Sequence, residues 1–106
     1  MKRTKRRYLA VNVQCEGVPS ERELLDAIWA SVTKLYGEVG ASQTGLVLID
    51  FDVERKLAVV RTALSCLPQV RASLAAVTAV AGREGSLEVL AVSGTLKALF
   101  SGLRGF

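Results

Sequence analysis

Residues 8–15 (YLAVNVQC), near the beginning of the chain, alternate between larger apolar residues (Leu9, Val11, Val13, Cys15) and a second set that includes Asn12 and Gln14. A period of two is typical of a strand with one buried face. Residues 46–52 (LVLIDFD) and 57–64 (LAVVRTAL) are also strand-like, and the turn-forming residues VERK between them predict a hairpin. Residues 86–92 (SLEVLAV) complete a set of four predicted strands.

Two segments between these strands follow the helical period instead. Ser20 and Glu23 form the S-x-x-E capping box, and the apolar stripe that follows predicts a helix over residues 20–36, which Gly37 ends. Residues 37–45 (GEVGASQTG) are predicted to be a loop. Pro68 marks the start of a second helix, with apolar residues recurring up to Ala81.

The last predicted strand is followed by Ser93-Gly94-Thr95 and by the helical segment TLKALFSGLRGF. The complete order is strand, helix, strand, strand, helix, strand and a terminal helix. This order predicts an α+β fold of the ferredoxin-like, or RRM-like, βαββαβ type, with two helices on one face of an antiparallel sheet and an additional C-terminal helix. We expect one domain over residues 8–106, with the first and third strands central, preceded by a separate arm over residues 1–7.

The other face of the sheet carries apolar residues of the hairpin. If Val47, Ile49 and Phe51 face the helices, the opposite face of the sheet holds Leu46, Leu48 and Val59. An apolar open face should be covered, either by the terminal helix or by a partner protein. We expect these three residues to be protein-interface residues. Asp50 and Arg61 are expected beside them, where they can pair across the hairpin.

The charge is concentrated at the N-terminus. The net charge is +4, and five of the fourteen basic residues lie in the first seven positions, which leaves nine basic and ten acidic residues elsewhere. A basic arm on a near-neutral domain favours a polyanionic partner, and the alternative is a solvated terminus without a role. These basic residues are Lys2, Arg3, Lys5, Arg6 and Arg7.

The composition argues against an independent enzyme. There is no histidine, and Cys15 and Cys66 have no metal-ligand spacing, so we expect two free thiols. Asp50 and Asp52 could hold a magnesium ion, but such residues more often open a turn. The chain has no twenty-residue apolar run and no signal-like segment, so we expect a cytoplasmic protein without a membrane span.

Phosphate recognition is a further possibility at the last helix. Gly94 permits close approach of a backbone, Thr95 can cap the helix, and Lys97 adds a positive charge. The alternative is an ordinary capped helix with an incidental lysine. The third strand has no aromatic residue and the first has only Tyr8, so base stacking on the open sheet is not expected. RNA binding would depend on charge, backbone amides and shape.

Five segments together resemble a known family, the small ferredoxin-like protein subunit of archaeal and eukaryal ribonuclease P, whose eukaryal form is shared with ribonuclease MRP. The resemblance covers residues 7–100 and rests on the order and spacing of RRYLAVNV, LYGEVGAS, AVVRTA, VRASLAAV and VSGTLKAL. It implies a non-catalytic RNA-binding and scaffold subunit of an endoribonuclease that removes the 5′ leader of precursor tRNA. The catalytic chemistry then belongs to the RNA subunit, with magnesium ions held by that RNA and no cofactor bound by this chain.

The resemblance also implies partners: ribonuclease P RNA, a TIM-barrel-like protein subunit, and a second such pair with which a heterotetramer forms. The expected RNA-contacting residues are Arg3, Lys5, Arg6, Arg7, Arg61, Gly94, Thr95 and Lys97. The alternative function is a homodimeric ferredoxin-like regulatory module that binds a small ligand, with GEVGAS as its ligand loop. The basic arm favours RNA.

Overall fold

A five-stranded antiparallel sheet with the strand order β2-β3-β1-β5-β4 organises the chain. The computed structural model describes residues 5–103. Its elements are β1 (Arg6–Cys15), α1 (Glu21–Ser42), β2 (Val47–Asp52), β3 (Leu57–Ala63), a 3-10 turn (Leu64–Cys66), α2 (Leu67–Ala75), β4 (Ala79–Val80), β5 (Arg83–Ser93) and α3 (Leu96–Gly102). None of the helices described within this range is long and apolar enough to cross a membrane.

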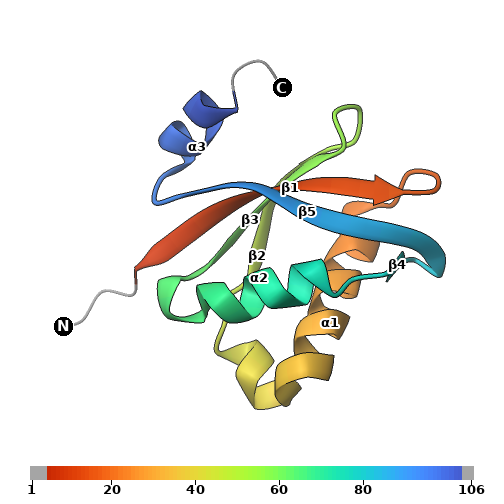
Figure 1. Cartoon of the computed structure of the whole chain (residues 1–106), viewed down its shortest axis with the longest axis horizontal. Coiled ribbons are helices and arrows are strands. Elements are labelled where there is room, and N and C mark those ends of the chain that lie inside the picture. Colours follow the sequence, from red (N-terminus) through yellow and green to blue (C-terminus); the bar gives the residue numbers. More distant parts are fainter. Residues whose placement is uncertain (1–4, 104–106) are drawn as a thin grey trace.

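The helices lie on both faces of the sheet. Helices α1 and α2 cover one face and α3 lies on the other (Figure 1). Between the sheet and the first two helices lies an aliphatic core that includes Leu9, Val11, Leu24, Ile28 and Val60, each with no exposed surface. The predicted ferredoxin-like sheet with a central first strand and an additional C-terminal helix is confirmed.

Helix α1 begins at the predicted capping box. The backbone N–H of Glu23 donates to Ser20 Oγ at 3.1 Å, and the N–H of Ser20 donates to Glu23 Oε1 at 3.0 Å. The second of these bonds is the main reason that the pKa of Glu23 lies below its ordinary value. Since the lowered pKa belongs to the folded state, this stabilising contribution is present at neutral pH and is lost as the pH falls through that pKa.

Replacing Ser20 with Ala should lower the free energy of unfolding by about 1 kcal/mol, because the N–H of Glu23 loses its acceptor. Chemical denaturation measures the change. Ser42→Ala is the matched control, since its exposed hydroxyl donates to the carbonyl of Val39 at the other end of the helix and its loss should cost less than about 0.5 kcal/mol. Equal losses in the two variants would show that the cap contributes nothing specific.

Gly37 interrupts the first helix where its end was predicted, but the residues after it are helical again and do not form the predicted loop. It adopts a positive φ of 76° and kinks the helix, which then resumes and continues to Ser42. A left-handed residue usually stops a helix, but glycine adopts this conformation without steric cost, so the chain can re-enter the helical conformation afterwards. Val39, two residues beyond the kink, is 72% exposed. Residues 38–42 are therefore helical, which removes the expected GEVGAS ligand loop.

Helix α2 ends at Ala75, earlier than the predicted end near Ala81. The following residues instead form β4, which pairs with the beginning of β5 through Val80↔Arg83 and Ala79↔Glu84. Ala81 and Gly82 have φ values of 54° and 77°, as the two central residues of a tight type I′ hairpin turn require. Val77 and Ala81 continue the apolar helical period of α2, so the sequence pattern predicted helix where the structure has this turn.

The assignment of β2 residues to the two faces was wrong. Leu46 is 5% exposed and Leu48 also packs against the core on the helix side of the sheet. The cause is a bulge: Leu48 lies opposite Val60 and Asp50 opposite Val59, so Ile49 is an extra residue and the alternation shifts. Leu46 and Leu48 therefore do not form the expected open-face interface.

Helix α3 covers the face that the sequence left open. Leu99 and Leu103 are 1% and 5% exposed and pack with Leu57, Val59 and Ala10 in a second, smaller core. Val59 faces this side as predicted but is only 2% exposed, so it contacts the chain's own helix and is not available to a partner.

Candidate nucleic-acid interface

The beginning of β1 lies beside the ends of β3 and β5, where the basic N-terminal segment joins the sheet (Figure 1). Strand β1 begins at Arg6, two residues earlier than predicted, and Arg6 and Arg7 pair with the end of β3. The backbone of Lys5 is also held, because its carbonyl accepts the N–H of Leu64 at 2.8 Å. Tyr8 lies between Arg61 of β3 and Ser93 of β5. The basic residues from position 5 onward thus belong to the folded domain.

Arg7 brings this segment against the turn that precedes α3. A Cβ atom built on Gly94 would lie 3.5 Å from Arg7 Nη1, so the guanidinium lies beside the Gly94 backbone. Nη1 also donates to the carbonyl of Arg6 at 2.9 Å. A contact of 3.5 Å is ordinary van der Waals distance, so a side chain at Gly94 is tolerated and the glycine is not required by the fold.

Thr95 is the N-cap of α3, as predicted. Its Oγ1 accepts the N–H of Ala98 at 3.1 Å, and its own N–H donates to Ser93 Oγ at 3.5 Å. One amide that a phosphate would use is therefore already occupied, and α3 has only seven residues. This geometry favours the structural role for Thr95. Lys97 is exposed in the first turn of the helix and adds a full charge close to Gly94.

Arg61 is half-buried on the face that carries α3, opposite Tyr8 on one side and Val47 on the other. The expected pairing of Arg61 with Asp50 is not a direct cross-strand one, because Asp50 lies opposite Val59. Asp50 Oδ1 instead accepts the N–H of Phe51 at 2.9 Å. Because Arg61 is two residues from the end of β3, it lies at the cationic end of the sheet.

We call this surface the basic end. Within the described residues its members are the cationic side chains that lie on the converging strand ends and on the first turn of α3. They are Lys5, Arg6, Arg7, Arg61 and Lys97. Arg3 lies outside the described residues. Sequence reasoning did not include Ser93, which lies opposite Tyr8 and accepts from Thr95, because a strand-end serine has no distinguishing pattern.

The alternative of a metal site at Asp50 and Asp52 is not supported. Asp52 Oδ1 accepts the N–H of Arg55 at 3.2 Å in the hairpin turn, and Asp50 bonds the bulged backbone. Over residues 5–103, no group of three or more His, Cys, Asp or Glu side chains is arranged to hold a metal ion. The two aspartates act as turn and bulge residues.

The fold and the basic end together define a class: a small ferredoxin-like α+β domain with a sheet face closed by its own C-terminal helix. Residues 7–103 match the family model described as the Rpp14/Pop5 family, and the chain belongs to this family. The assignment covers all of the basic end except Lys5 and Arg6.

Curated proteins with a common name are similar to this chain. "Ribonuclease P protein component 2" of Methanosarcina mazei is 34% identical over 95 residues, which cover 90% of this chain and 80% of the relative. The protein of that name from Pyrococcus furiosus is 33% identical over 97 residues, with 92% and 81% covered. A chain in the cryo-EM structure of yeast ribonuclease MRP aligns with a TM-score of 0.73 over 98% of this chain and 95% of its own length. At 11% identity, the last match establishes the shared fold alone.

Replacing Lys97 with Ala should reduce the salt dependence of RNA binding by about one unit in the slope of log K against log[salt], because one phosphate contact is lost. Fluorescence anisotropy with ribonuclease P RNA at several salt concentrations measures the slope. Lys34→Ala is the control, since Lys34 is an exposed lysine on α1, on the other side of the sheet. An unchanged slope for the Lys97 variant would assign Lys97 a role in the helix alone.

Proposed function

We propose that this chain is a protein subunit of ribonuclease P that binds the RNA subunit through the basic end and so supports the removal of the 5′ leader from precursor tRNA. The observation that carries the proposal is the convergence of cationic residues from β1, β3 and α3 at one end of a member of the Rpp14/Pop5 family. Arg7 beside Gly94 links the two segments that are far apart in sequence.

The proposed mechanism assigns no bond-breaking step to the chain. Its sequence has no histidine to act as a general base near neutral pH. Cationic side chains offset the repulsion between RNA phosphates where helices of the RNA approach one another, which stabilises the folded RNA. The RNA then holds the magnesium ions that act on the scissile phosphate. The chain lowers the magnesium concentration that the RNA needs, because its fixed charges replace part of the ion atmosphere.

The proposed protein partners are a TIM-barrel-like subunit and a second pair of the same two subunits, which forms a heterotetramer. This part of the proposal rests on the family resemblance. We do not propose Leu46, Leu48 and Val59 as its contact surface, because Leu46 and Val59 are buried and Leu48 is partly buried against the helix-side core. The proposed contact surface is instead a group of exposed apolar side chains near the end of α1, namely Leu35, Tyr36 and Val39.

Omission from a reconstituted enzyme tests the proposal. Ribonuclease P RNA and the companion proteins are combined with and without this chain, and cleavage of a precursor tRNA is followed at several magnesium concentrations. We expect cleavage without the chain to require a higher magnesium concentration, and to be restored when the chain is added. Identical magnesium profiles would contradict the proposal.

A further inference from the structure

Within residues 5–103, the outer edge of β5 is unpaired over most of its length. On one side β5 pairs with β1 from Gly85 to Ser93. On the other side, the pairing within residues 5–103 is limited to β4, which reaches only Glu84, and to a bond from the N–H of Gly85 to the carbonyl of Thr78 at 3.0 Å. The rest of this edge has no strand beside it in the described part of the chain.

The ladder shows which backbone groups point outward. The N–H of Val13 donates to the carbonyl of Lys56 at 2.8 Å, so it points toward β3 and away from β5. Val13 lies opposite Leu87, so these two residues form a pair without mutual hydrogen bonds. The N–H and carbonyl of Leu87 therefore point away from β1. Val89, opposite Val11, repeats the arrangement two residues later. Such outward groups are a template for another strand.

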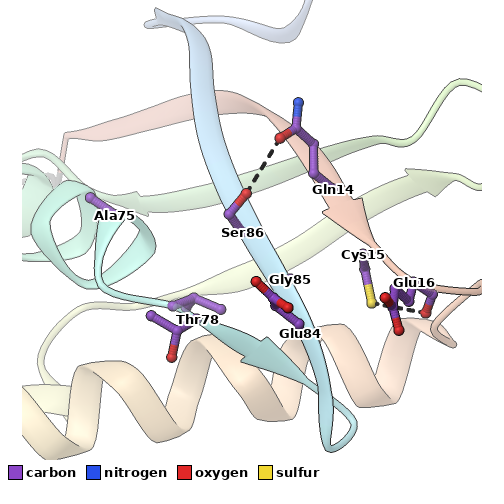
Figure 2. A pocket seen from close by; sticks show the side chains of 9 residues that line it. Gln14, Cys15, Glu16, Ala75, Thr78, Glu84, Gly85 and Ser86 are labelled. Carbon is purple, nitrogen blue, oxygen red and sulfur yellow. Dashed lines mark hydrogen bonds between the residues drawn. The ribbon is translucent and has the colours of Figure 1, made fainter.

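A groove follows this edge between β5 and α2. It consists of two adjoining hollows of about 710 and 400 Å³, which share Ala75 of α2 as a lining residue. Figure 2 shows the first hollow, with Ala75 on one side and Glu84 and Ser86 of β5 on the other. Alanine side chains at 72 and 75 leave space beside the strand, and the side chains of Leu87 and Val89 form an apolar floor. The groove thus offers hydrogen bonds and apolar contacts to one extended segment.

The charge of the groove selects the chemistry of the occupant. Glu16 and Glu84 line the first hollow and Glu88 lines the second, against one basic residue, Arg71. An acidic lining repels RNA phosphates and attracts lysine or arginine side chains. The first hollow lies beside Cys15 at the other end of β1 from Arg6, about 30 Å away at the ordinary rise of a strand. The second hollow reaches Val89, opposite Val11, and is about 17 Å from Arg6 by the same rise.

We propose that the β5 edge and the α2 groove bind an extended, basic segment of a companion protein, which adds to the sheet as a sixth strand. Alternate side chains of the segment are apolar and face Leu87 and Val89, and its lysine or arginine residues meet Glu84 and Glu88. The inference rests on the proposed function only in taking the companion from the ribonuclease P particle. It separates an RNA-binding end from a protein-binding edge on the same small sheet.

Hydrogen exchange of single amides tests the inference. Exchange is compared for the chain alone, with ribonuclease P RNA alone, and in the particle reconstituted with the RNA and companion proteins. We expect the amides of Leu87 and Val89 to exchange at least about tenfold more slowly in the particle, because they become hydrogen-bonded. The amides of Ser86 and Glu88, which point toward β1, are internal controls that should already be protected in the chain alone.

A pair of variants tests the groove itself. Ala75→Arg places a bulky cation in the groove from an exposed position, and should weaken assembly with the companion protein by about tenfold. Ala76→Arg, at the neighbouring exposed alanine that lines neither hollow, should assemble normally. RNA binding, measured separately by anisotropy, should be unchanged in both.

Three results would overturn the inference: unchanged exchange at Leu87 and Val89 in the particle, protection of these amides by RNA alone or by concentrating the chain alone, or equal assembly of the two variants. Loss of the proposed function would appear differently, as absence of RNA binding by the unmodified chain.

Discussion

Replacing Leu99 with Ala should lower the free energy of unfolding by about 3 kcal/mol, the usual cost of removing a fully buried leucine side chain. Leu99 is 1% exposed and is the central contact of α3 with the sheet face that carries Val59. Because α3 is a seven-residue helix that depends on this packing, the loss should appear first as undocking of α3. Chemical denaturation gives the change in stability, and hydrogen exchange of α3 amides shows the undocking.

Phe100→Ala is the matched control for this prediction. Phe100 is the next residue on the same helix and is larger, but it is 46% exposed. Its replacement should cost less than about 1 kcal/mol. A cost equal to that of the Leu99 variant would mean that the burial of Leu99 against the sheet does not hold the helix in place. Release of α3 would also alter the basic end, because Lys97 is carried by this helix.

Removing three charges from the basic end should weaken RNA binding on the order of a hundredfold at about 0.1 M salt, because each lost phosphate contact removes about 0.9 from the salt slope. The variant is K5Q/R61Q/K97Q, which keeps long polar side chains on β1, β3 and α3. The expected decrease in slope is about 3 units. Anisotropy titrations at several salt concentrations measure both quantities.

The control carries the same net charge. K34Q/K56Q/R71Q removes three cations from α1, the hairpin turn and α2, all exposed and away from the basic end. If the surface binds RNA specifically, the control should lose much less affinity than the first variant. Equal losses would show that only the net charge matters, and that the RNA does not distinguish the basic end from the rest of the surface.

Local patterns in the sequence determined much of the fold. The alternation in residues 8–15, the capping box at Ser20 and the N-cap at Thr95 each involve neighbours within a few residues. The end of the first strand, the start of α1 and the start of α3 were therefore predicted correctly. The order of elements then restricted the fold to a ferredoxin-like sheet, because short connections and antiparallel pairing leave few alternatives.

The errors occurred where one residue changes the local geometry. The bulge at Ile49 reverses the faces of Leu46 and Leu48, and a period of two contains no sign of an inserted residue. The kink at Gly37 and the turn at Ala81 and Gly82 each require a positive φ. Residue type permits such a conformation but does not impose it, since packing elsewhere decides whether the helix continues or ends.

The sequence by itself determined the positions of the basic residues, the absence of histidine and the family resemblance. Only the tertiary structure decided which of these residues meet. Arg7 reaches Gly94, and Arg61 lies beside Tyr8, because β1 lies between β3 and β5 in one sheet. Likewise, only the packing of Leu99 and Leu103 shows that the chain covers its own sheet face. Only the strand pairing shows that, among residues 5–103, no strand lies beside the outer edge of β5 beyond Gly85. Side chains distant in sequence become neighbours through strand register and helix docking, which depend on the whole core and not on any local run of residues.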